Sequence, residues 1–129
     1  MKHFLLSATL LMAGSGSAWA DQVLGSYYAY IGADDFYNSR GTRLTDPCAI
    51  LQQDRANYHR FGIWHDGDQS DPFFDNRAAR TVISQDCRAF PSSGYVADSL
   101  RRGEIKYVYV QVHGRAGRVT YVMFGEGAG

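Results

Sequence analysis

The stretch EIKYVYVQVHGRAGRVTYVMF, residues 104–124, decides the fold, because two segments of alternating apolar residues flank a turn that contains two glycines. Successive side chains of a strand point to opposite faces, so every second residue shares a face. One face of the first segment carries only valines: Val108, Val110 and Val112. The pattern predicts a β-hairpin whose valine face packs against the core.

The opposite face of this hairpin carries Ile105, Tyr107 and Tyr109. Tyr121 of the second segment, or a tyrosine of an N-terminal strand, is expected beside them. Tyrosine offers a large contact area at low entropic cost and keeps a polar tip, which suits a surface that binds a protein or a sugar. Two alternatives follow from the sequence: this face stays partly open as a binding surface, or helices cover it.

Upstream of the hairpin, the sequence predicts one strand and three helices. VLGSYYAYIG, residues 23–32, is rich in aromatic residues and favours a strand. TDPC and SDPF each place an aspartate before a proline, which predicts helices over 47–60, ending at Gly62, and over 72–84. Residues 92–103 suggest a third, short helix. The fold class is therefore α+β, with a small, largely antiparallel sheet packed on two to three helices.

The second predicted helix places three apolar residues on one side, four positions apart: Phe74, Ala78 and Val82. Cys87 follows its end, and Cys48 lies in the first turn of the helix before it. These are the only two cysteines, and an even count in an exported chain predicts one disulfide. In the chain-entropy model, closing the loop of about 40 residues between Cys48 and Cys87 stabilises the fold by about 4 kcal/mol.

The N-terminal residues 1–20 have the pattern of a secretory signal peptide. Lys2 is followed by an apolar run and then by the small-x-small motif Ala18-Trp19-Ala20. Residues 21–129 are then predicted to form a single domain, periplasmic or secreted. Without Lys2 that domain has 12 basic and 13 acidic side chains, so no nucleic-acid binding and no membrane insertion are expected.

The helix predicted over 47–60 has one unusual position, Arg55. A helical wheel places it at the centre of an apolar stripe formed by Leu44, Cys48, Leu51 and Tyr58. A buried guanidinium needs acceptors, because an unpaired buried charge costs several kcal/mol. The loop acids Asp34 and Asp35 are the predicted partners. Arg55 is then either a structural link to that loop or a contact for a ligand anion.

Two histidines lie in the same polar region, which spans residues 54–71. His59 and Arg60 fall in the last turn of the helix, where positive charge meets free carbonyl groups. His65 follows Trp64, which is predicted to fill the core beneath the connecting segment. Either histidine could instead act as a general base with a neighbouring aspartate, as in a small hydrolase.

DGDQSD, residues 66–71, has the alternating acids of a calcium loop at Asp66, Asp68 and Asp71. However, it lacks the turn glycine and the final glutamate that an EF-hand needs, and acids before a helix are also favoured by its dipole. No cofactor and no metal site are predicted. The sequence shows no Gly-x-Ser-x-Gly motif and no phosphate-binding glycine loop.

Taken together, these features predict a small exported binding or accessory protein, such as an inhibitor, whose partner is a protein or the cell wall. The predicted binding residues are Arg55, His59, His65, Tyr107, Tyr109 and Tyr121. A periplasmic hydrolase that uses His59 or His65 and a calcium-dependent binding module are the alternatives.

Overall fold

A computed structural model describes residues 20–127, and it confirms the predicted α+β fold. The sheet has four strands in the order β1-β3-β4-β2. β3 is antiparallel to both β1 and β4, whereas the short β2 runs parallel to β4 and was not predicted. The strands are β1 (Gln22–Ile31), β2 (Cys87–Ala89), β3 (Lys106–Arg115) and β4 (Arg118–Glu126). The main helices are α1 (Pro47–Ala56), α2 (Arg77–Gln85) and α3 (Gly94–Arg101).

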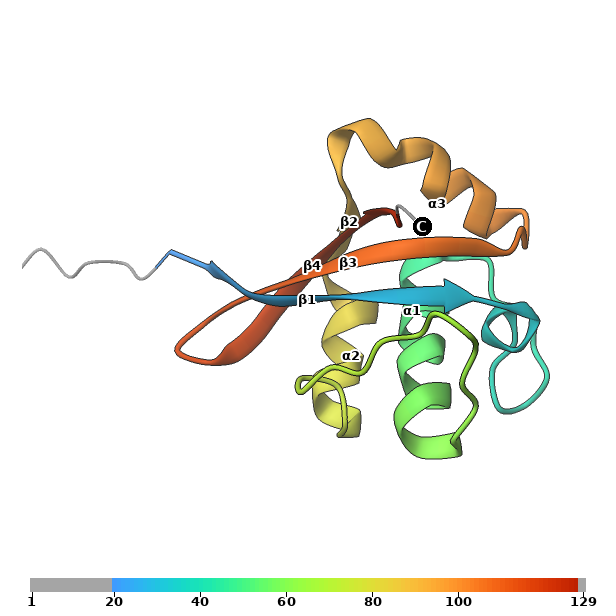
Figure 1. The fold of residues 1–129 in the computed structure, drawn as a ribbon, viewed down its shortest axis with the longest axis horizontal. Helices are drawn as coiled ribbons and strands as arrows, with labels where there is room; N and C mark the ends of the chain where they lie inside the picture. The colour runs from blue at the N-terminus through green and yellow to red at the C-terminus, as the bar shows by residue number, and fades with distance from the viewer. Residues whose placement is uncertain (1–19, 128–129) are drawn as a thin grey trace, which may run out of the picture.

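One face of the sheet forms the core. The predicted valine face is confirmed, because all three valines of β3 are fully buried. β1 and β4 add side chains to the same face: Tyr27, Ala29, Ile31, Val122 and Phe124. Figure 1 shows α1 and α2 behind the sheet, α3 beside its upper edge, and no helix in front of β1 and β3.

α1 begins and ends as the sequence predicts. The Asp46 side chain accepts a hydrogen bond from the Cys48 N–H, and Pro47 takes the first helical position. The helix continues as one turn of π-helix, Asn57–Phe61, and ends at Gly62, whose φ of 66° lies in the left-handed region. After this turn the chain lies at the surface, since Ile63 and Trp64 are exposed.

The predicted start of α2 at Pro72 is wrong. The helix begins at Arg77, and its N-cap is Asn76, whose side chain accepts a hydrogen bond from the Ala79 N–H. Phe74 is buried but precedes the helix, so the predicted stripe through Phe74, Ala78 and Val82 does not form. Ala78 is exposed, and the fully buried residue of the helix is Ile83. Asp71 and Pro72 instead form a turn that stops short of a helix.

The predicted disulfide is confirmed and joins Cys48 of α1 to Cys87 of β2. It links the first turn of α1 to the strand at one edge of the sheet. α3 is shorter than the predicted 92–103, but its predicted inner residues Val96 and Leu100 are both buried. Among residues 20–127, no helix has the length and apolar character needed to cross a bilayer. The predicted signal peptide falls on residues 1–19, outside the described range.

The loop before α2 runs along the outer side of β1 (Figure 1). The Gln69 N–H donates to the Tyr28 carbonyl at 2.9 Å, and the Gln69 side-chain oxygen accepts from the Tyr28 N–H at 3.1 Å. Asp68 accepts from the Tyr30 N–H at 2.8 Å. These three bonds take the place of a fifth strand over this part of β1.

Candidate functional site

Arg55 is fully buried, as its place in the apolar stripe predicts. Its guanidinium donates to Asp54 at 2.8 Å, to Asp71 at 2.9 Å and to the Gln69 carbonyl at 2.9 Å. It also lies over two aromatic rings, those of Tyr27 and Tyr58, 4.2 and 4.6 Å from their centroids. Two acidic side chains of the same chain therefore accept hydrogen bonds from this buried cation.

The predicted partners of Arg55, Asp34 and Asp35, are wrong. Asp35 is buried, but it accepts hydrogen bonds from the Gly32 N–H and from the Asn57 amide at 2.9 Å. Burial raises the pKa of Asp35, although these bonds act in the opposite direction. Asp34 lies on the surface. The cause of the difference is the loop over β1, which carries Asp71 back to the middle of α1 and so supplies a nearer carboxylate.

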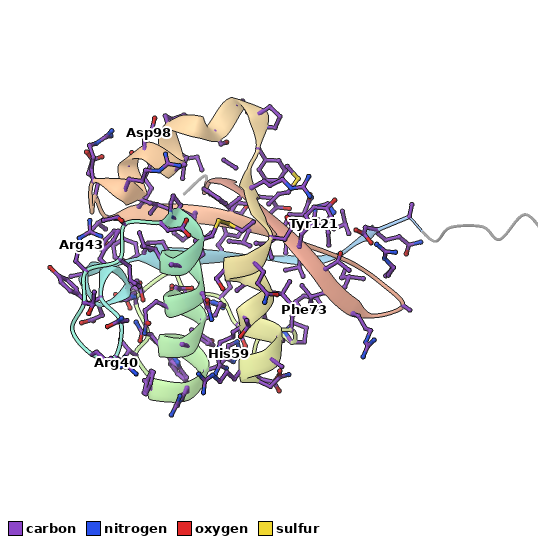
Figure 2. All side chains as sticks on the ribbon, turned by 180° about the vertical axis from the view of Figure 1, so that it is seen from behind. Arg40, Arg43, His59, Phe73, Asp98 and Tyr121 are labelled. Atoms are coloured by element: carbon purple, nitrogen blue, oxygen red, sulfur yellow. A yellow bond between two sulfur atoms is a disulfide. The ribbon has the colours of Figure 1, made fainter. Side chains whose placement is uncertain are left out.

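Asp71 also holds His59, whose Nε2 lies 2.8 Å from its carboxylate. Figure 2 shows His59 near the lower end of α1, on the side that faces α2. Burial alone would raise the pKa of Asp71, but bonds from His59, Arg55 and the N–H groups of Phe73 and Phe74 outweigh it and lower this pKa. We call Asp54, Arg55, His59 and Asp71 the polar network.

Asp54 shows the opposite balance within the polar network. Its carboxyl group is fully buried, and this burial raises its pKa to about 8, against the lowering effect of the Arg55 charge. Asp54 and Asp71 contact the same guanidinium, yet their affinities for protons move in opposite directions. The difference arises because Asp71 accepts several more hydrogen bonds.

His65 lies among three carboxylates without a short hydrogen bond to any of them. Its ring nitrogens are 3.7 Å from Asp34, 3.7 Å from Asp35 and 3.5 Å from Asp68. The ring packs against Gly32, where a Cβ atom would come within 2.7 Å of Nε2. His65 therefore sits in a different cluster from His59, and the structure does not bring the two predicted histidines together.

The prediction that Trp64 fills the core is wrong, because 67% of its surface is exposed. Its indole ring stacks on Tyr58 with centroids 5.3 Å apart, and its N–H donates to the Tyr58 carbonyl at 2.8 Å. The left-handed turn at Gly62 sends this segment outward. Trp64 is thus held firmly at the surface with one face free.

Trp64 belongs to a group of large apolar side chains exposed at the end of α1. The group, here named the apolar rim, consists of Tyr37, Phe61, Ile63 and Trp64. These side chains are between 37 and 67% exposed. Sequence reasoning missed this surface, although the run FGIW, residues 61–64, directly after a helix end, is a signal for it.

A groove of about 390 Å³ opens beside the apolar rim, between α1 and the loop that follows β1. Its lining combines aromatic and aliphatic side chains with amides and one carboxylate: Asp34, Tyr37, Asn38, Ser39, Gln53, Asn57, Phe61 and Ile63. Asn57 is buried at its floor and accepts a hydrogen bond from Gln53 at 2.9 Å. This volume falls within the range of small-molecule and side-chain pockets.

The predicted tyrosine face exists and is half-buried. Tyr28 of β1 stacks on Tyr107 and contacts Tyr109, with ring centroids 5.5 and 5.3 Å apart. Tyr121 is not part of this group, because it stacks on His113 at 4.4 Å farther along the sheet. The structure thus brings Tyr107 and Tyr109 together and leaves Tyr121 apart.

The acidic loop does not bring its three carboxylates to one point. Asp68 is bound to the N–H groups of Tyr30 and His65, Asp71 belongs to the polar network, and Asp66 is exposed. Within residues 20–127, no group of three or more histidine, cysteine or acidic side chains is arranged to hold a metal ion. Neither His59 nor His65 lines the groove.

Comparison with models of protein families, with curated proteins and with solved structures found no match for this chain.

Proposed function

We propose that this chain is an exported binding protein, periplasmic or secreted, that docks a partner protein on the apolar rim and the groove beside it. The observation that carries the proposal is the exposure of four large apolar side chains, three of which, Tyr37, Phe61 and Ile63, line one hollow. Contiguous exposed apolar patches are uncommon on monomeric proteins and are typical of interaction surfaces. Trp and Tyr, both present here, dominate the binding energy of protein interfaces.

Contacts with neighbouring residues hold Trp64 of the apolar rim and the floor of the groove in place, which favours binding. Trp64 is fixed by its stack on Tyr58 and by its indole hydrogen bond. The buried Asn57 ties the floor of the groove to Asp35 of the loop after β1. A surface that is ordered before the partner arrives loses less conformational entropy on binding.

The tyrosine face is a second candidate surface for the same function. Tyr107 and Tyr109 are half-buried and stack on neighbouring rings, so less of their area is free than at Trp64. We therefore place the main contact on the apolar rim.

The disulfide and the short helices suit an exported chain of this kind.

The test is capture of a partner from a cell-envelope extract, with identification by mass spectrometry. The Phe61→Ser, Trp64→Ala double variant is expected to retain less than a tenth of the partner that the unchanged chain retains. Such a tenfold loss corresponds to about 1.4 kcal/mol of binding free energy. Val23→Ser is the control, since Val23 is 55% exposed and lies outside the rim. It is expected to retain the partner fully.

Two results would contradict the proposal. If the double variant binds as well as the unchanged chain, the apolar rim is not the docking surface. If only Tyr107→Ser, Tyr109→Ser abolishes retention, the tyrosine face is the docking surface instead. Thermal unfolding of each variant separates loss of binding from loss of structure.

A further inference from the structure

Arg80, on the side of α2 that faces α1, is buried but has no acidic partner among residues 20–127. Only 6% of its surface is exposed, and its guanidinium donates to the Phe74 carbonyl at 3.1 Å. The ion pairs that arginines form among residues 20–127 do not include it. A charge in this position is ordinarily paired, because burial removes the water that would otherwise solvate it.

Two more arginines lie beside Arg80 and also have no acidic partner within the described residues. Arg60, from the end of α1, and Arg77, from the start of α2, line the same hollow of about 300 Å³. We name it the arginine hollow; its lining is Ser39, Gln52, Gln53, Ala56, Arg60, Phe61, Arg77 and Arg80. The lining contains three guanidinium groups and no carboxylate.

The position of Arg77 and Arg80 on α2 adds an unfavourable electrostatic free energy to this cluster when no anion is bound. Arg77 is the first residue of the helix and Arg80 follows three residues later. The N-terminal end of a helix carries a partial positive charge, which favours acidic residues there and disfavours basic ones. An anion in the hollow would offset both the helix dipole and the three guanidinium charges.

We infer that the arginine hollow binds a carboxylate presented by an acidic segment of the partner protein. This inference rests on the proposed function and deepens it. Phe61, Gln53 and Ser39 line both the arginine hollow and the groove, so the two sites are continuous. A segment seated on the apolar rim therefore reaches the arginines with its next side chains.

The chemistry of the hollow matches a carboxylate. Guanidinium groups donate two parallel hydrogen bonds to a carboxylate, and such charge-assisted pairs are stronger than neutral ones. Gln52 and Gln53 add amide groups to the same lining. The apolar rim next to it selects a protein segment with apolar residues followed by an acid.

The first experiment uses glutarate as a small dicarboxylate probe and inorganic phosphate as its competitor. Both are titrated into the chain with its Cys48–Cys87 disulfide formed, while the arginine Nε–Hε signals are followed by NMR. We expect glutarate to shift the Arg80 signal saturably, and Arg80→Gln to weaken this binding at least about tenfold. Arg118→Gln is the control, because Arg118 is exposed and lies in the hairpin away from the hollow.

The second experiment measures capture of the partner from the envelope extract. Arg60→Gln, Arg77→Gln changes only exposed side chains, so the fold is retained, and we expect at least about tenfold less partner than with Arg118→Gln. If this double variant captures the partner fully while the Phe61, Trp64 variant does not, the inference fails and the proposed function stands. Binding of phosphate without binding of glutarate, or no shift of the Arg80 signal with either anion, also overturns the inference.

Discussion

Arg55 of α1 and Arg80 of α2 are both buried, yet they differ in what surrounds their charge. Arg55 contacts two carboxylates of its own chain at 2.8 and 2.9 Å. Arg80 contacts one backbone carbonyl and two other arginines share its hollow. The difference teaches that removing Arg55 would leave buried acidic groups without their partner, whereas removing Arg80 would not.

Replacing Arg55 gives the largest expected effect. Arg55→Met leaves Asp54 and Asp71 buried without their cation, so we expect the free energy of unfolding to fall by about 3–5 kcal/mol. Arg60→Met is the matched control on the next turn, and its exposed side chain predicts a change within about 0.5 kcal/mol. Urea unfolding measures both. Unchanged stability of Arg55→Met would instead support the ligand-binding role for Arg55.

The second prediction concerns Asp71 and pH. Asp71→Asn is expected to cost about 1–3 kcal/mol at pH 7, since it removes the charge that Arg55 and His59 contact. The folded pKa of Asp71 is below its unfolded value, so its contribution is fully present above the unfolded pKa of about 3.9 and is lost as the pH falls through the folded pKa.

The difference in stability between the unchanged chain and Asp71→Asn should therefore narrow on acidification below about pH 4. Thermal unfolding from pH 7 to pH 2.5 measures this. Asp66→Asn is the control, because Asp66 is exposed and its replacement should leave a difference near zero at each pH. A constant difference across the range would show that the Asp71 charge does not contribute through the polar network.

The smallest expected effect, and the sharpest contrast with Arg55, comes from Arg80. Removal of an uncompensated buried charge relieves its desolvation cost, so Arg80→Met should leave the free energy of unfolding unchanged or raise it by up to about 1 kcal/mol. The same substitution at Arg55 is expected to have the opposite sign. A loss of more than about 2 kcal/mol in Arg80→Met would mean that Arg80 has a structural role like that of Arg55.

Local patterns predicted much of the fold. Alternation in residues 104–124 predicted the hairpin and its buried valines, and the Asp-Pro motif and Gly62 predicted both ends of the first helix. The burial of Arg55 followed from its helical position alone. Each of these features depends on residues close together in the sequence.

The errors come from the path of the loop between α1 and α2. Asp71 does accept hydrogen bonds from the next N–H groups, at Phe73 and Phe74, as an N-cap would, so its sequence signal is locally correct. The helix nonetheless starts at Arg77, and because of this later start two features were not predicted. Arg77 and Arg80 fall in the first turn of α2, and Asp71 is free to reach Arg55.

The exposure of Trp64 was predicted wrongly for a related reason. A large aromatic residue between a helix and an acidic loop fits either a core or a surface position. The left-handed turn at Gly62 decides between them through a backbone direction that the composition of the segment does not specify.

The bonds that Asp68 and Gln69 make to β1 also cover part of an edge strand of the sheet. An edge strand with free N–H and C=O groups is a template on which another chain can add a strand, and repeated addition leads to aggregation. Over Tyr28 and Tyr30 that template is already occupied. The loop thus leaves less of this edge open to strand addition by a second copy.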